Sequence, residues 1–158
     1  MKSLNFYNGN IIPENDTIFV FGSNPDGIHG AGSAKVALNH FGAQYGIGKG
    51  LVGNSYALPT KDIRVMKNNG YKSISEEDII QNIRELYTCA KNNPNKKFKV
   101  AYRNKGNEVT LNGYNGYEMS QMFIKAGEIP ENMYFSQEWK ELMCSQLHPP
   151  KGGCLSKG

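Results

Sequence analysis

The chain has no long apolar run and no cysteine framework, and its first residues do not predict a secretory leader. No apolar stretch approaches the roughly 20 residues that a bilayer-spanning helix needs, and the first residues, MKSLNFYNGNII, contain one lysine and no apolar signal core. We therefore expect a cytoplasmic protein without a membrane partner. The three cysteines, Cys89, Cys144 and Cys154, are irregularly spaced, so they predict neither a disulfide framework nor a metal site.

The composition is that of one globular domain that suits an anionic ligand. The 158 residues are 39% hydrophobic and 20% charged, and the net charge is +4. Lysine and arginine are scattered, however, and the densest basic cluster, at 95–99, is explained by a solvated loop at least as well as by a nucleic-acid surface. We therefore do not expect a nucleic-acid partner.

Strand and helix patterns alternate along the chain. Strands are expected at 4–7, 17–22, 55–59, 98–102 and 133–135, helices at 34–41, 75–90, 116–126 and 136–147, and a glycine-rich loop at 42–53. This alternation predicts a three-layer α/β/α fold whose central sheet is mixed and largely parallel. We expect one domain over 1–147, followed by a flexible tail at 148–158.

A glycine-rich loop follows the most apolar strand, in the segment IFVFGSNPDGIHGAGSA from Ile18 to Ala34. Glycine lets the backbone approach a ligand, and the helix that follows brings a positive dipole end to the same place. The segment therefore predicts a phosphate site, although tight turns also use glycine for steric reasons. Because ligands lie beyond the carboxyl ends of parallel strands, we expect the loops after Gly22, Pro59 and Tyr102 to meet there.

A second glycine-rich segment, NGYNGYE at 112–118, lies between a predicted strand and a helix. Two interpretations of it are open. It could close on the second phosphate of a diphosphate, or it could be a polar hairpin turn, for which Asn-Gly is a strong signal.

These motifs together resemble the macrodomain family. The turn NGNI at 8–11, the strand that leads to Asn24, the loop HGAGSA at 29–34 and the second glycine-rich segment are similar to the family's pattern over roughly 4–135. The run HFGAQYGIGKGLVGNSYALPTKD further resembles macrodomain-like proteins of tailed bacteriophages. The resemblance implies a macrodomain-like fold that binds ADP-ribose, and many members of the family also hydrolyse it from proteins or hydrolyse ADP-ribose 1″-phosphate.

Carried over by position, the resemblance implies a set of ligand contacts. Asn10 stands where the family often has an aspartate for the adenine amino group, and an amide gives a weaker bond than a carboxylate. The implied contacts are Asn10, Ile11, Gly22, Ser23, Asn24, Gly30, Ala31, Gly32, Ser33, Asn112, Gly113, Tyr114, Asn115, Gly116 and Tyr117.

The catalytic candidates are Asn24, His29 and Lys61. The segment SYALPTK at 55–61 is similar to glycohydrolase-type macrodomains, in which the lysine attacks the distal ribose with help from an aspartate. The aspartate position falls on Asn115 here, which cannot transfer a proton, and Asp62 and Glu118 are the alternative carboxylates. A lysine needs a lowered pKa for this role, and a surface cation is the other interpretation of Lys61. His29 could move a proton in a phosphatase reaction or could hold a turn.

The residues leave two function classes open. One is a hydrolase, either an ADP-ribose 1″-phosphate phosphatase or an ADP-ribosyl glycohydrolase. The other is a non-catalytic module that binds ADP-ribose or a nucleotide signal in phage counter-defence. In both, we expect a monomer that needs no cofactor or metal and whose partner is ADP-ribose or an ADP-ribosylated protein or nucleotide.

Overall fold

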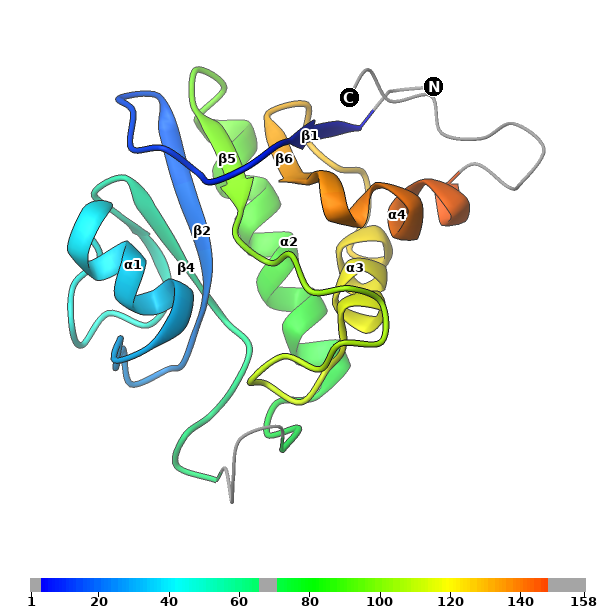
Figure 1. The fold of residues 1–158 in the computed structure, drawn as a ribbon. Helices are drawn as coiled ribbons and strands as arrows, with labels where there is room; N and C mark the ends of the chain where they lie inside the picture. Colours follow the sequence, from blue (N-terminus) through cyan, green and yellow to red (C-terminus); the bar gives the residue numbers. More distant parts are fainter. Residues whose placement is uncertain (1–3, 66–70, 148–158) are drawn as a thin grey trace.

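The computed structural model describes residues 4–65 and 71–147 and has the predicted α/β architecture (Figure 1). The expected strands and helices are present, with bounds that differ by a few residues; the expected tail at 148–158 lies outside the described residues. In chain order the elements are β1 (Asn5–Tyr7), β2 (Thr17–Ser23), α1 (Gly32–His40), β3 (Gly50–Val52), β4 (Ser55–Pro59), α2 (Glu76–Asn92), β5 (Lys97–Val100), α3 (Gly116–Lys125), β6 (Met133–Ser136), the 3-10 turn η1 (Gln137–Trp139) and α4 (Lys140–Leu147).

The strands form one six-stranded sheet in the order β1-β6-β5-β2-β4-β3. All neighbours pair in parallel except β3 and β4, which are antiparallel. The sheet is therefore mixed and largely parallel, as predicted. The prediction of a loop throughout 42–53 is wrong for Gly50–Val52, because an edge strand of three residues between glycines carries no alternating pattern and is defined by its pairing with β4.

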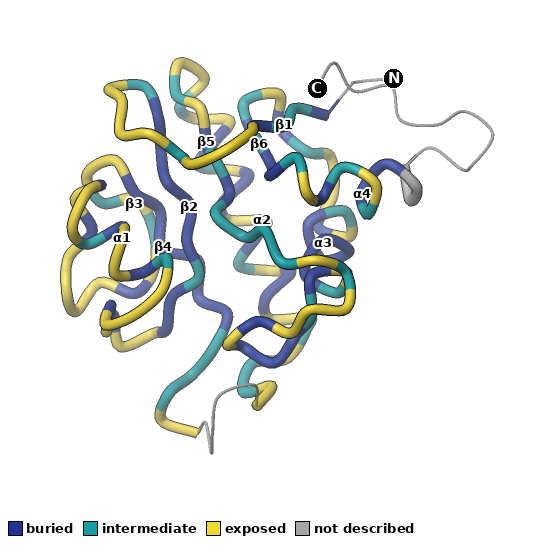
Figure 2. The backbone as a smooth tube through the Cα atoms, in the orientation of Figure 1, coloured by how far each residue is buried: buried dark blue, intermediate teal, exposed yellow. Residues whose placement is uncertain are grey.

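Helices cover both faces of the sheet. Along β2, Phe19 and Phe21 pack with α1 in one apolar cluster, whereas Ile18 and Val20 face the larger cluster that α2, α3 and α4 share. Successive side chains of a strand point to opposite faces, so an all-apolar strand supplies both layers. β2 is accordingly buried along almost its whole length (Figure 2).

The start of α2 follows the predicted capping pattern. The Ser75 side chain accepts a hydrogen bond from the Asp78 N–H at 3.2 Å, and acidic side chains fill the first turn. Within the described residues, no helix is long and apolar enough to cross a membrane. Cys89 has a free thiol, whereas Cys144 takes part in a disulfide bond that the spacing of the cysteines did not predict.

Candidate functional site

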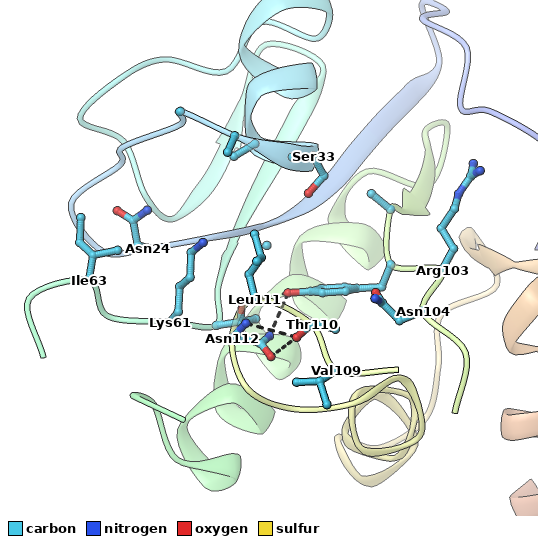
Figure 3. A pocket seen from close by; sticks show the side chains of 18 of the residues that line it. Asn24, Ser33, Lys61, Ile63, Arg103, Asn104, Val109, Thr110, Leu111 and Asn112 are labelled. Carbon is cyan, nitrogen blue, oxygen red and sulfur yellow. Dashed lines mark hydrogen bonds between the residues drawn. The ribbon is translucent and has the colours of Figure 1, made fainter. Parts of the chain in front are cut away.

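A cleft with a volume of about 630 Å³ lies at the carboxyl edge of the sheet (Figure 3). It is lined by residues that follow β2, β4 and β5, by the first turn of α1 and by the loop 108–112. The expectation that the loops after Gly22, Pro59 and Tyr102 meet at this edge is confirmed. The lining positions are 22, 24, 28, 30–34, 60, 61, 63, 101–104 and 108–112.

The amino end of α1 opens onto this cleft without a side-chain cap. The N-cap position is Ala31, which has no side-chain acceptor, and the first turn contains no acidic residue. The first N–H groups of a helix have no partner within the helix. Gly32 begins the helix with φ +58°, which a residue with a side chain rarely adopts. This end of α1 therefore presents N–H groups and a positive dipole end to the cleft.

Asn24 lines the cleft but uses both ends of its amide within its own loop. Its Nδ2 donates to the Ile28 carbonyl at 2.9 Å, and its Oδ1 accepts from the Ile28 N–H at 3.1 Å. The side chain is buried, with 3% of its surface exposed. Asn24 therefore shapes the loop between β2 and α1, a local role that its place after a buried strand did not reveal.

The loop that contains Ile47 and Gly48 supports the loop between β2 and α1 by close backbone packing. A Cβ atom on Gly27 would lie 2.4 Å from the Ile47 nitrogen, and one on Gly48 would lie 2.0 Å from the Asn24 carbonyl oxygen. The Ser23 hydroxyl also donates to the Gly48 carbonyl. Ser23 is thus bound to the supporting loop and is not among the residues that line the cleft.

His29 lies beneath the glycine-rich loop, away from the cleft lining. Its side chain is fully buried, and its Nε2 lies 3.1 Å from the Ile47 carbonyl oxygen. The ring packs edge-on against Phe21 at 5.2 Å and stacks on Tyr45 at 6.0 Å. This placement favours the interpretation of His29 as a residue that holds the turn rather than one that transfers a proton to a ligand.

Lys61 lies at one end of the cleft beside Asn24 and Ile63 (Figure 3). It is half-buried, and burial lowers the pKa of its amine. In the described part of the chain it forms no ion pair, and the carboxylate of the neighbouring Asp62 pairs with Arg64 at 2.9 Å. Of the three catalytic candidates, Lys61 is the one whose ionisable group lines the cleft.

Arg103 lies at the other end of the cleft, with Asn104 (Figure 3). Its guanidinium donates to the Gly9 carbonyl and lies 5.8 Å from the centre of the Tyr7 ring. Among the described residues it too forms no ion pair. Sequence reasoning missed Arg103, since an arginine just beyond a predicted strand is common on protein surfaces.

The predicted contacts Asn10 and Ile11 do not line the cleft. Asn10 is exposed, and Ile11 packs against the apolar cluster under α1. They lie next to Gly9, which accepts the hydrogen bond from Arg103. The end of the cleft that holds Arg103 is therefore the end nearest to the turn that resembles the adenine-binding turn of macrodomains.

A hydrogen-bonded group forms the floor of the cleft. The Tyr102 hydroxyl lies 2.9 Å from the Thr60 hydroxyl, and the Asn112 Nδ2 donates to it at 3.2 Å. The Asn112 Oδ1 accepts from the Thr110 hydroxyl and from the Tyr114 N–H. Burial raises the pKa of Tyr102 to about 12, so its hydroxyl keeps the proton at neutral pH. Sequence reasoning missed Thr60 and Tyr102, although both stand at carboxyl ends of predicted strands.

The second glycine-rich segment forms a hairpin-like turn on the rim of the cleft. The Thr110 N–H donates to the Tyr114 carbonyl at 2.9 Å, and Gly113 adopts φ +93° in the turn. Of the predicted contacts in this segment, Asn112 lines the cleft. The others, which do not line it, are Gly113, Tyr114, Asn115, Gly116 and Tyr117.

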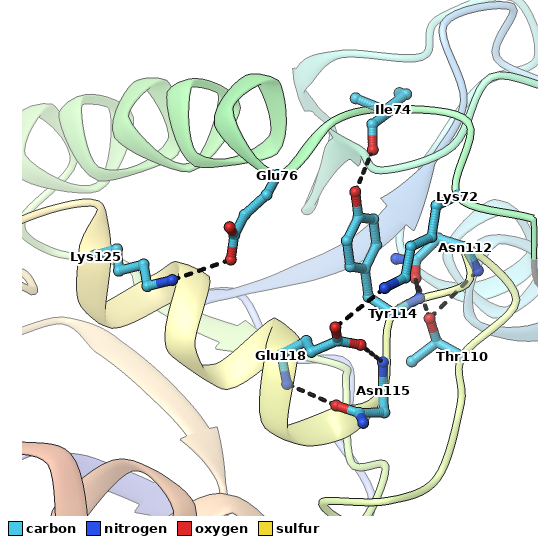
Figure 4. Close-up of polar contacts among 9 residues, drawn as sticks. All are labelled: Lys72, Ile74, Glu76, Thr110, Asn112, Tyr114, Asn115, Glu118 and Lys125. Atoms are coloured by element: carbon cyan, nitrogen blue, oxygen red, sulfur yellow. Dashed lines mark hydrogen bonds and ion pairs between the residues drawn. The ribbon is translucent and has the colours of Figure 1, made fainter.

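Asn115 and Glu118 are engaged at the start of α3 (Figure 4). The Asn115 side chain accepts from the Glu118 N–H at 2.8 Å, and the Glu118 carboxylate accepts from the Asn115 N–H at 2.9 Å. This N–H and the Lys72 ammonium, 3.1 Å from the carboxylate, lower the pKa of Glu118. Glu118 is therefore committed to a capping box and is not an acid or base of the cleft.

In the part of the chain that the structure describes, no three His, Cys, Asp or Glu side chains are grouped as metal ligands. Two further residues of types that can bind a metal, His148 and Cys154, lie outside the described residues. Comparison of the chain with models of known protein families, with curated proteins and with solved structures finds no match. The likeness to macrodomains therefore depends on the sequence motifs.

Proposed function

We propose that the cleft binds ADP-ribose or a derivative of it. The observation that carries this proposal is the uncapped amino end of α1, which opens onto a cleft of about 630 Å³ between Lys61 and Arg103. Small-molecule sites typically have volumes of about 300–1,000 Å³. Helix N–H groups and two cations that form no ion pair with any described residue suit a ligand with more than one negative charge.

The proposed orientation places the diphosphate against Gly30–Ser33 at the start of α1. The distal ribose then lies toward Asn24 and Lys61, and the adenosine lies toward Arg103. The resemblance of the NGNI turn to the adenine-binding turn supports this direction. Because Asn10 is exposed and outside the cleft lining, we expect the adenine to contribute less to affinity than the phosphates do.

The proposal includes hydrolysis of the ligand, with the protein acting as an ADP-ribosyl glycohydrolase or a 1″-phosphate phosphatase. This activity depends on Lys61. Burial favours the neutral amine, which is the nucleophilic form. The second candidate function, a non-catalytic binding module, is favoured by the positions of the other groups. Both ends of the Asn24 amide bond within its own loop, His29 lies outside the cleft lining and Asn115 caps α3.

Calorimetry with ADP-ribose, followed by phosphate-release and de-ADP-ribosylation assays on the same sample, tests the proposal. We expect saturable binding that weakens in Lys61→Ala and is unchanged in Lys49→Ala, a matched control whose ammonium pairs with Glu85 at 3.0 Å. Product that appears with wild type but not with Lys61→Ala identifies the hydrolase. Binding without product identifies the module. Absence of heat at millimolar ADP-ribose would overturn both.

The proposal also takes the protein to be a cytoplasmic monomer that does not recognise nucleic acid. A protein that recognises nucleic acid would bind an oligonucleotide with an affinity that falls steeply as salt concentration rises, and free ADP-ribose would not compete with it. Competition between ADP-ribose and a fluorescent oligonucleotide, at two salt concentrations, separates the two cases. We expect no salt-sensitive oligonucleotide complex.

A further inference from the structure

The hydroxyl groups of Thr60 and Tyr102 have one proton more than the acceptors that the described residues offer them. Their mutual hydrogen bond at 2.9 Å uses one hydroxyl proton, and Asn112 Nδ2 supplies a further proton to the Tyr102 oxygen. Among the described residues, neither hydroxyl has another acceptor. Both residues line the cleft, and Thr60 is only 1% exposed. A buried donor without a partner is costly, so the site is incomplete in this respect.

The direction of the hydrogen bonds places that proton on Thr60. The Asn112 Oδ1 already accepts two hydrogen bonds, which fixes the amide with its Nδ2 toward Tyr102. The Tyr102 oxygen therefore accepts from Asn112. A phenol is a stronger acid than an aliphatic hydroxyl, so in the Thr60–Tyr102 pair the phenol donates and Thr60 accepts. The Thr60 proton is left to point toward an acceptor in the cleft.

We propose that the Thr60 hydroxyl is a fixed donor to an oxygen atom in the ribosyl-phosphate half of the ligand. This inference rests on the proposed function and adds a specificity-determining residue to it. Thr60 directly precedes Lys61, and its Oγ1 would lie 3.2 Å from a Cβ on Gly22, at the end of β2. It thus belongs to the part of the cleft assigned to the distal ribose and its phosphate.

Tyr102 and Asn112 act as positioning residues in this arrangement. Because Tyr102 donates to one lone pair of the Thr60 oxygen, that bond does not use the Thr60 proton, which stays unpaired unless the ligand offers an acceptor. The site therefore favours an acceptor, such as a phosphate or ring oxygen, over a donor at this point. Sites built to satisfy a specific hydrogen bond discriminate strongly against ligands that lack the matching group.

Calorimetry with Thr60→Val and Thr60→Ser tests the inference. Valine has the shape of threonine without the hydroxyl, and serine keeps it. We expect the Kd for ADP-ribose to rise roughly 10- to 150-fold in Thr60→Val, as for loss of a hydrogen bond to a charged acceptor. In Thr60→Ser the Kd should stay within about 3-fold of wild type. With AMP, which lacks the ribosyl-phosphate half, Thr60→Val should bind as wild type does.

Tyr87→Phe is the matched control for lost stability. The Tyr87 hydroxyl donates to the Phe123 carbonyl in the core and does not line the cleft, so its loss should lower the melting temperature but leave the Kd unchanged. Equal Kd values for ADP-ribose in wild type and Thr60→Val would overturn the inference, as would an equal penalty with AMP. If wild type does not bind ADP-ribose, the proposed function fails, and inorganic pyrophosphate becomes the probe. Equal affinities of wild type and Thr60→Val for pyrophosphate would then overturn the inference as well.

Discussion

Replacing Gly22 with alanine will displace the floor of the cleft. A Cβ atom at this position would lie 2.2 Å from the Tyr102 hydroxyl oxygen, 3.0 Å from its Cζ and 3.2 Å from the Thr60 Oγ1. Ordinary contact begins near 3.4 Å, so the hydroxyl must retreat by about 1.2 Å, the difference between 3.4 and 2.2 Å. That movement breaks or lengthens its bonds to Thr60 and Asn112, which are 2.9 and 3.2 Å long.

The expected cost combines two effects. Loss of two neutral hydrogen bonds costs about 1–3 kcal/mol, and overpacking of a dense interior costs about 1–3 kcal/mol more. Because relaxation will recover part of this, we expect the free energy of unfolding of Gly22→Ala to fall by roughly 2–4 kcal/mol. Urea denaturation measures it directly. ADP-ribose affinity should fall as well, since Thr60 and Asn112 lose their positions.

The double variant Gly22→Ala/Tyr102→Phe separates steric clash from general damage. Removal of the hydroxyl removes the 2.2 Å contact and leaves the milder one at 3.0 Å. We therefore expect the double variant to be more stable than Gly22→Ala alone, although Tyr102→Phe by itself is destabilising. Additive losses in the double-mutant cycle would show that the clash with Tyr102 is not the cause, and the reasoning would be refuted.

Three further predictions concern the ends of the cleft and the start of α3. If Lys61 binds an anion as an ammonium, the affinity for ADP-ribose will decrease as pH rises through the lowered pKa of Lys61. If Lys61 is a nucleophile, the rate of hydrolysis will instead increase over the same pH range. Profiles of affinity and rate that match those of Lys61→Ala would exclude both roles. Ala31→Asp should cap α1 and stabilise the protein by about 1 kcal/mol. It should also weaken ADP-ribose binding at least 10-fold, because the carboxylate occupies the N–H groups and repels phosphate. Unchanged affinity by calorimetry would contradict the proposed phosphate position. Asn115→Ala should cost about 1 kcal/mol in urea denaturation and leave the Kd unchanged, because Asn115 caps α3 and does not line the cleft; a weaker Kd would restore it as a ligand contact.

The sequence was sufficient for the fold because its signals are local. The nearly continuous burial of β2, the Ser75 cap and the apolar stripe of α2 each follow from residues that are close together in the chain. β3 escaped prediction because an edge strand of three residues is defined by its partner strand. The glycine-rich loop and the edge of the sheet where ligands bind were also predictable from the order of elements.

The individual site residues were harder to predict because their roles depend on contacts far along the chain. His29 is held outside the cleft lining by its contacts with Ile47 and Tyr45, which lie 18 and 16 residues further along the chain. Thr60 meets Tyr102 across 42 residues. A resemblance assigns a residue to a position in the chain but does not say which way its side chain points. Among the glycines, Gly22, Gly30 and Gly32 line the cleft, whereas Gly113 and Gly116 do not.

The packing of Gly27 and Gly48 against the neighbouring backbone affects how mutational data on this protein should be interpreted. A side chain at either position would collide with main-chain atoms that cannot move aside. A saturation-mutagenesis screen for binding will therefore mark Gly27 and Gly48 as intolerant of substitution. It will also mark Gly30 and Ser33 if these residues contact the ligand. A parallel screen for cellular abundance will separate the two groups, because variants of Gly27 and Gly48 will be depleted in both screens.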